Sequence, residues 1–297
     1  MRDAFIDELV GAARSGKDVA LVVGDLGYKV VEPFADEFPH LFINAGIAEQ
    51  NMMGLAAGMA SEGVHVFVYS IANFPTFRCA EQIRNDVDYH DLPVTIVAVG
   101  GGLAYGNLGY SHHAIQDYAL MRAMPNIVIA APGDSLEVRG CMRFLIANPQ
   151  PSYLRLGKAT DLVAHQGIPV VSPGKWLSIM PSLSAAAADK TIITTGATLE
   201  LACQWLNSNS RYEGYAVHSL PLWGMSAKSS QPEQAMSWDQ IVSVEDHLMD
   251  GGFGSWLMES LYGSSYDLAK ISLRYLDQKV CGMVGRQSTL NRIGGLS

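Results

Sequence analysis

The pattern of apolar and polar positions in the first half of the chain alternates between short apolar runs and longer segments with helical spacing. The runs are rich in β-branched residues, are typical of buried strands that end in turns, and lie at 19–25, 64–70, 94–102 and 127–134. Helices are predicted at 46–61, 78–90, 114–124 and 134–147. Such alternation predicts βαβ units and a mostly parallel sheet, which binds ligands at the carboxyl ends of its strands.

A second alternation follows a segment without a clear period. Residues 156–176 contain three glycines and two prolines, a composition typical of connecting chain. Beyond them, strands are predicted at 190–197, 214–223 and 239–247, and helices at 198–208 and from 251–256 onwards. We therefore expect an α/β fold of two domains, each a mostly parallel sheet flanked by helices, with boundaries at 1–158, 159–188 for a linker, and 189–297.

The composition is that of a globular protein with a large core, since 48% of the 297 residues are apolar and 16% are charged. The net charge of −9 argues against nucleic acid as a partner, because phosphate binding needs clustered Lys and Arg. The four cysteines lack C-x-x-C spacing, so we expect no metal site on this chain and no disulfide framework. The start lacks a secretory hydrophobic segment and the longest apolar run, 52–60, is too short to span a bilayer, which predicts a cytoplasmic protein with no membrane partner.

Glu49 is a carboxylate among small and apolar residues at the start of a predicted helix. The strand at 41–44 meets this helix at Gly46, so Glu49 falls in the first helical turn, where the helix dipole favours an anion. Gly54 and Gly58 are four residues apart and leave one face of the helix open to the approach of another backbone. On spacing alone, Glu49 is interpreted as a capping acid.

The glycine-rich stretch GGGLAYGNLG at 100–109 follows a predicted strand. A dinucleotide fingerprint, G-x-G-x-x-G, would need its third glycine where Tyr105 stands, so this signal is weak. The stretch GYSHHAIQD then opens the next predicted helix with Ser111 as N-cap, which would put His112 and His113 in its first turn. Adjacent histidines diverge around a helix and make a poor metal chelate, so a solvated pair is the simpler interpretation.

Two further clusters carry candidate binding groups. Phe74, Phe77 and Arg78 follow the carboxyl end of a predicted strand, where an aromatic ring either belongs to the core or stacks on a planar ligand. Arg155 and Lys158 lie at the edge of the first predicted domain and form either a solvated face or an anion site.

The order and spacing of these segments are more specific than any one of them. GIAEQNMMGLAAGMA, FPTFRCAEQIRND, GNLGYSHHAIQD, MPNIVIAAPGD and PSYLRLGK, in this order, closely resemble the pyrimidine-binding domain of transketolase-like thiamine diphosphate enzymes. VEDHLMDGGFGSWLMESL resembles the carboxy-terminal domain of the same enzymes. The resemblance covers essentially the whole chain. It implies the thiamine diphosphate-binding fold for 1–158 and a transketolase C-terminal-like domain for 189–297.

The resemblance implies roles for individual residues. It assigns Glu49 to the N1′ nitrogen of the cofactor's aminopyrimidine, where shared proton exchange leads to deprotonation of the thiazolium C2 and attack on a donor ketose. His112 matches the family histidine of G-x-[ST]-H, which contacts substrate oxygens. Either Phe74 or Phe77 is expected to stack on the aminopyrimidine, because Pro75 makes the alignment ambiguous.

The remaining positions carry over less directly. Asp25 matches a family aspartate near the cofactor, and Arg78 belongs to the expected cofactor-binding set. Arg155 and Lys158 occupy the region where relatives bind a substrate phosphate. Leu108 stands where many transketolases have an aspartate that contacts a sugar hydroxyl, which favours a modified sugar or a specialised pathway over ordinary pentose phosphates.

The motif that holds the cofactor's diphosphate in this family, G-D-G followed by paired asparagines, does not occur in the sequence. The chain therefore resembles one subunit of a split transketolase, with Mg²⁺ or Ca²⁺ expected on a second subunit that carries the diphosphate-binding domain. The expected assembly is a homodimer or an α2β2 heterotetramer, and the expected substrate is a sugar phosphate or a modified sugar.

Other functions stay open at this stage. The chain could be the β-subunit of a 2-oxo acid dehydrogenase, although the G-x-[ST]-H motif and the pair Arg155 and Lys158 favour a transketolase. It could also be a non-catalytic partner that kept the fold, an interpretation against which Glu49 and His112 count. A dinucleotide-dependent oxidoreductase is disfavoured by the glycine spacing.

Overall fold

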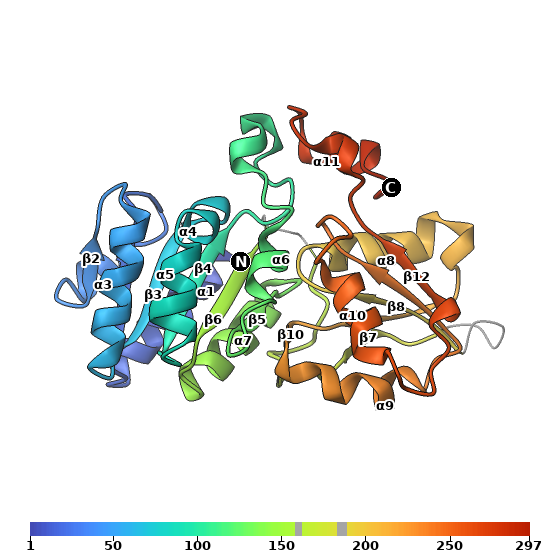
Figure 1. The fold of residues 1–297 in the computed structure, drawn as a ribbon, viewed down its shortest axis with the longest axis horizontal. Helices are drawn as coiled ribbons and strands as arrows, with labels where there is room; N and C mark the ends of the chain where they lie inside the picture. The colour runs from blue at the N-terminus through green and yellow to red at the C-terminus, as the bar shows by residue number, and fades with distance from the viewer. Residues whose placement is uncertain (158–161, 183–188) are drawn as a thin grey trace.

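The computed structural model describes residues 1–157, 162–182 and 189–297 and arranges them around two sheets (Figure 1). The first sheet has seven strands in the order β10-β5-β6-β4-β3-β1-β2. Its strands are β1 (Val19–Val23), β2 (Phe42–Asn44), β3 (His65–Ile71), β4 (Val94–Val99), β5 (Val128–Ala130), β6 (Ser152–Leu156) and β10 (Leu222–Gly224). Apart from β10, which is antiparallel to β5, the strands of this sheet pair in parallel.

The second sheet has five strands in the order β12-β11-β8-β9-β7. They are β7 (Leu177–Met180), β8 (Lys190–Thr194), β9 (Ala216–Ser219), β11 (Gln240–Val244) and β12 (Ile271–Arg274). Among the described residues of this sheet, β7 pairs with β9 in an antiparallel manner and the other pairings are parallel. The expected fold class, two mostly parallel sheets flanked by helices, is therefore confirmed.

Helices cover the faces of both sheets (Figure 1). Around the first sheet they are α1 (Arg2–Arg14), α2 (Glu32–Glu37), α3 (Glu49–Ser61), α4 (Asn73–Phe77), α5 (Ala80–Gln82), the π-helical turn η1 (Ile83–Asp88), α6 (Asp117–Met121) and α7 (Ser135–Ala147). Around the second they are α8 (Thr198–Ser208), α9 (Gln231–Ala235) and α10 (Phe253–Leu261), whereas α11 (Gln287–Ile293) packs beside residues 106–108 of the first half (Figure 1). Short 3₁₀ turns include η2 (Gly106–Leu108), η3 (Tyr110–His112), η5 (Ser210–Tyr212), η6 (Ser226–Ser230), η7 (Leu268–Lys270) and η8 (Gln278–Val280).

The segment predicted at 214–223 as one strand is two strands that belong to different sheets. β9 lies inside the second sheet, whereas β10 crosses over and adds to the edge of the first sheet beside β5. Pro221, which lacks an N–H to donate, separates them, and its carbonyl accepts a hydrogen bond from the backbone of Ala131. The range 159–188 also differs from its expectation as a linker, because it contains β7, an edge strand of the second sheet.

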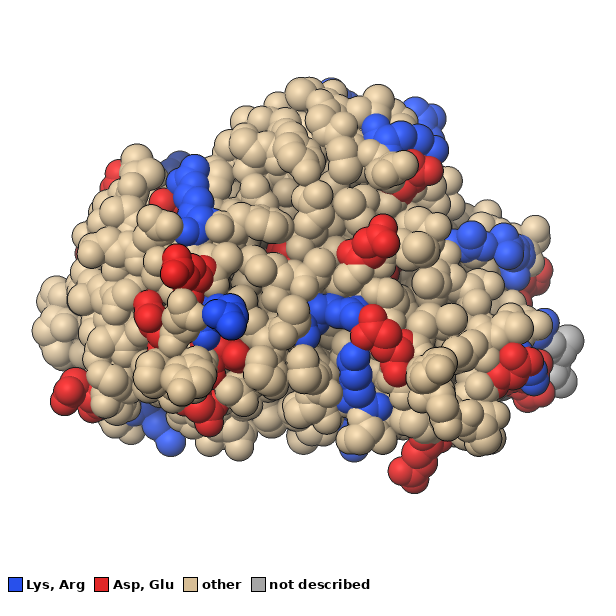
Figure 2. Space-filling view, in the orientation of Figure 1, with Lys and Arg blue, Asp and Glu red and all other residues tan. Residues whose placement is uncertain are grey.

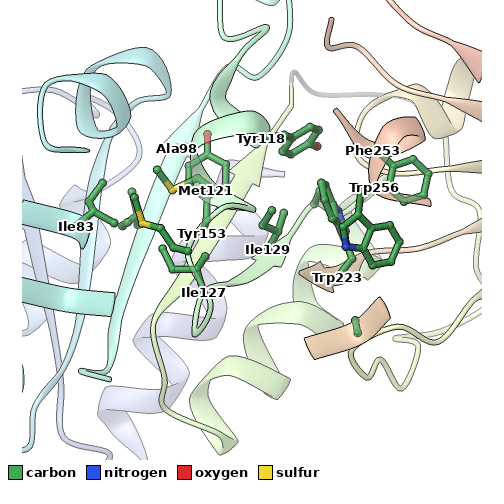
Figure 3. Packing of buried hydrophobic residues seen from close by; sticks show 14 of the residues in the cluster. Ile83, Ala98, Tyr118, Met121, Ile127, Ile129, Tyr153, Trp223, Phe253 and Trp256 are labelled. Carbon is green, nitrogen blue, oxygen red and sulfur yellow. The ribbon is translucent and has the colours of Figure 1, made fainter. Parts of the chain in front are cut away.

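A buried aromatic cluster joins the two halves at the crossover strand. Trp223 of β10 packs against Trp256 and Phe253 of α10 with ring centroids 5.2 and 5.4 Å apart, and its other neighbour, Tyr118 of α6, lies 5.0 Å away. Figure 3 shows these rings at one end of a continuous core that extends through Ile129 and Tyr153 to Ile83. Since burial of an aromatic side chain contributes strongly to stability, the crossover strand fixes one half against the other.

On the face shown in Figure 2, Lys and Arg are scattered among Asp and Glu, and neither sign of charge forms a large patch.

In the described ranges, no helix is both long enough and apolar enough to cross a membrane.

Candidate functional site

The turn before α3 presents Glu49 at the carboxyl edge of the first sheet. Gly46 has a φ of 71°, a left-handed conformation that glycine adopts without strain, and its N–H donates to the side chain of Asn44 at 3.0 Å. Helix α3 then begins at Glu49 and buries Met52, Met53 and the small residues that follow on one face. Only 5% of Glu49 is exposed, so its carboxylate is nearly buried.

Glu49 is paired with an arginine from the next strand–helix unit. Arg78 Nη1 donates to Glu49 Oε1 at 2.9 Å, and the guanidinium carbon lies 4.3 Å from the centre of the Phe74 ring. The two charged side chains and residues 47, 48, 50 and 51 line a hollow of about 440 Å³. The structure therefore brings together three of the residues predicted from sequence: Glu49, Phe74 and Arg78.

Of the two candidate phenylalanines, only Phe74 faces this cluster. Its ring meets the ring of His112 edge to face, with centroids 5.1 Å apart, and carries Arg78 on its face. Phe77 is 45% exposed and makes no such ring contact among the described residues. The neighbouring Asn73 side chain donates to the carbonyl of Ser111 at 2.9 Å and holds the histidine-bearing loop against α4.

The loop with the adjacent histidines differs from the helix start expected there. Residues Tyr110–His112 form a 3₁₀ turn, His113 is extended, and α6 begins only at Asp117, so Ser111 is not an N-cap of that helix. The Ser111 hydroxyl lies 3.0 Å from His112 Nδ1 instead. His113 is buried, and burial lowers the pKa of its ring, so the pair is not solvated as a unit.

Asp25 follows the end of β1, and the side chain of Asn44 links it by hydrogen bonds to the turn before Glu49. Its backbone is left-handed, with φ of 56°, a conformation that Asp tolerates better than most residues. Asn44 donates to the Asp25 carboxylate at 3.0 Å, and its side-chain oxygen accepts from the N–H groups of Asp25 and Gly46. Asn44 is not among the residues predicted from the sequence, although its place at the carboxyl end of the short parallel strand β2 is a signal for a positioning role.

Arg155 does not offer a free cation. It lies on β6, an interior strand of the first sheet, and is 2% exposed. It donates from Nε to Asp117 at 2.7 Å and from Nη2 to the carbonyl of Ala114 at 2.7 Å. Nη1 pairs with Asp246, which follows β11 in the other half of the chain. A substrate phosphate would have to displace two buried carboxylates, so the structure argues against the expected anion role of Arg155.

The electrostatics of this buried pairing explain why the arginine is held inside. Burial raises the pKa of Asp246, and the charge of Arg155 opposes that rise. The guanidinium also lies over the ring of Tyr118, 4.3 Å from its centre. The network therefore joins β6 and α6 to the segment after β11, and works as a cross-link between the two halves.

Two remaining positions, Lys158 and Leu108, have different outcomes. Lys158 lies outside the described residues. Leu108 is half exposed in η2 and offers no polar group to a sugar. Within the described ranges, no group of three or more His, Cys, Asp or Glu residues could hold a metal ion.

Comparison with known proteins finds one family model and many relatives. The model described as "Transketolase, pyrimidine binding domain" matches residues 1–160. An apulose-4-phosphate transketolase subunit of Phocaeicola vulgatus is 33% identical over 265 residues, which cover 88% of this chain and 83% of that protein. The "Putative transketolase C-terminal section" of Methanocaldococcus jannaschii is 32% identical over 303 residues, covering 100% and 92%.

Other matches are longer proteins or solved structures. The 1-deoxy-D-xylulose-5-phosphate synthase of Pseudarthrobacter chlorophenolicus is 29% identical, over 98% of this chain but 44% of that protein. A solved chain described as "Split gene transketolase, inactive beta4 tetramer" is 27% identical with a TM-score of 0.83, and the match covers 100% of this chain and 93% of that one. A transketolase mutant from Pichia stipitis, at 21% identity and a TM-score of 0.78 over 100% of this chain and 44% of that one, shares the fold.

Proposed function

Because this chain belongs to the transketolase family, we propose that it is the subunit of a split transketolase that supplies the aminopyrimidine side of a thiamine diphosphate site. Two relatives, one named as a transketolase subunit and the other as a C-terminal section, match over most of their length. The synthase relative matches over less than half of its own length. This difference in coverage supports an enzyme divided between two chains.

The observation that carries the proposal is the nearly buried carboxylate of Glu49, which lines a hollow and is linked through Arg78 to the face of the Phe74 ring. An aminopyrimidine needs an acceptor for its ring nitrogen and a flat apolar surface, and Glu49 and Phe74 fit those needs. When bound, thiamine diphosphate supplies the nucleophilic carbon that takes up a two-carbon ketol unit. Glu49 would hold a proton at N1′, and Phe74 would orient the ring.

The loop beside Phe74 supplies the substrate-facing group. The ring of His112 packs edge to face against the ring of Phe74, and from this contact we infer that a nitrogen of His112 would donate to oxygens of the sugar. Asp25 and Asn44 would steady the turn that leads to Glu49. Phe77, which faces solvent, is better suited to a contact with another subunit than to stacking on the cofactor.

The diphosphate and its Mg²⁺ or Ca²⁺ would be held by a partner subunit with the diphosphate-binding domain, in an α2β2 assembly. The structural neighbour described as an inactive beta4 tetramer supports the view that chains of this kind associate without being active alone. The substrates would be sugar phosphates or a modified sugar, and the exposed Leu108 favours the latter. A cytoplasmic location stays a prediction.

Two other functions predict different results. A β-subunit of a 2-oxo acid dehydrogenase would release carbon dioxide, whereas a transketolase moves a two-carbon unit between sugars. A non-catalytic partner would leave turnover unchanged when Glu49 is altered. The names of the two relatives that are 33% and 32% identical favour the transketolase.

The isolated chain is expected to bind thiamine diphosphate weakly and to turn nothing over, because the proposal assigns the diphosphate side of the site to a partner subunit. Addition of the partner subunit should restore tight binding and two-carbon transfer. Calorimetry measures cofactor binding, and product analysis measures two-carbon transfer. Both are applied to the chain alone, the partner alone and the mixture. Micromolar cofactor binding by the isolated chain would contradict the proposed division of the site, and release of carbon dioxide would select the dehydrogenase.

His112 and His113 are expected to fail in different ways. His112→Ala should lower kcat and kcat/KM together, by up to about 100-fold, because it removes a donor used in the transition state. His113→Ala should instead lower the free energy of unfolding by about 1–3 kcal/mol, because the ring is buried and its removal leaves a gap. Steady-state kinetics and chemical denaturation of both variants separate the two. A kinetic defect in His113→Ala alone would move the substrate contact to His113.

A further inference from the structure

The Arg78 guanidinium occupies both contacts that the proposed site offers to an aminopyrimidine. It lies on the face of Phe74, 4.3 Å from the ring centre, and donates to Glu49 Oε1 at 2.9 Å. A guanidinium is planar and delocalised, stacks on aromatic rings and presents N–H groups in its plane. In shape and in hydrogen bonding it therefore resembles a protonated nitrogen heterocycle, and the two cannot occupy the same ring face at once.

We propose that Arg78 is a displaceable placeholder, which occupies the aminopyrimidine position in the unloaded subunit and leaves it when the cofactor binds. The inference rests on the proposed function and changes the role expected for Arg78 from a cofactor ligand to a competitor. The Glu49 carboxylate is almost buried, whereas the Arg78 side chain is 49% exposed. Arg78 can therefore turn into solvent without leaving its own charge desolvated.

The proposed division of the site between two subunits gives a physical reason for a residue that occupies the cofactor position. A carboxylate in a nearly buried position is costly without a partner, and Arg78 supplies that partner until a ring nitrogen takes its place. Arg78 must bind weakly enough for the cofactor to displace it. A half-exposed ion pair and one cation–π contact are weak interactions of this kind. The cofactor cannot bind while Arg78 occupies the site. The apparent affinity for the cofactor is therefore reduced to the fraction of subunits in which Arg78 has left it.

The two possible roles of Arg78 predict opposite signs for one measurement. A ligand that is removed weakens cofactor binding, whereas a competitor that is removed strengthens it. The matched control is Arg84, an exposed arginine of η1 whose side chain donates to its neighbour Asn85. Arg78→Ala and Arg84→Ala make the same change in charge on the same stretch of chain.

Calorimetric titration of thiamine diphosphate into the complex reconstituted with its partner subunit tests the inference without an activity assay. The complex with Arg78→Ala is expected to bind the cofactor about 5- to 10-fold more tightly than the unaltered complex. The cofactor then no longer has to displace a weak ion pair and one cation–π contact. Arg84→Ala should stay within about twofold. Weaker or unchanged binding by Arg78→Ala, with the unaltered complex binding normally, overturns the placeholder and leaves the proposed function intact. Failure of the unaltered complex to bind thiamine diphosphate overturns both.

Discussion

Glu49→Gln is expected to lower the turnover of the reconstituted complex by about 10²–10⁴-fold while the subunit stays folded and assembled. Glutamine keeps the shape of the side chain but cannot exchange a proton with the ring nitrogen of the cofactor. Steady-state kinetics measures the loss, and the rate of hydrogen–deuterium exchange at the thiazolium C2 of bound cofactor should fall in parallel. Unchanged exchange would return Glu49 to the role of a capping acid.

A second first-turn acid provides the control for this experiment. Glu200 lies in the first turn of α8, in the other half of the molecule, and is the kind of acid that a helix dipole stabilises. If Glu49 acts only on the dipole of α3, both glutamine variants should lose about 0.3–1 kcal/mol of stability and no activity. If Glu49 acts on the cofactor, only its variant should lose turnover.

Arg155→Ala is expected to lower the free energy of unfolding by about 3–5 kcal/mol, because it leaves the carboxylates of Asp117 and Asp246 buried without their partner. Chemical denaturation measures the change. Arg14→Ala is the control, since its pair with Glu37 is exposed and screened by water, so its loss should leave the free energy of unfolding nearly unchanged. Adding Asp246→Asn to Arg155→Ala should recover part of the loss, because one unpaired charge is removed.

This prediction also separates the two roles considered for Arg155. A cross-link between the halves acts on stability, whereas a phosphate-binding arginine acts on KM for a phosphorylated sugar. Normal stability with a raised KM in Arg155→Ala would restore the role expected from the sequence. Loss of stability in Arg155→Ala and recovery in the double variant would support the cross-link.

Much of the site depended on tertiary structure because its contacts join distant segments. Glu49 and Arg78 are 29 residues apart, and no local pattern predicts their hydrogen bond. Phe74 and Phe77 are both plausible on α4 from spacing, and only the packing of the His112 loop distinguishes them. The functional roles of these residues stay predictions until the variants are measured.

The sequence by itself determined the alternation of strands and helices, the parallel sheets and the place of Glu49 at the start of α3, because hydrophobic periodicity and turn residues act over a few positions. Tertiary structure alone decided that β10 leaves its own half for the first sheet and that Arg155 is buried. A charged residue in a strand suggests exposure until its partners are known, and one partner of Arg155 lies 91 residues further along the chain. Burial of a charge depends on what folds against it, and that information is not local.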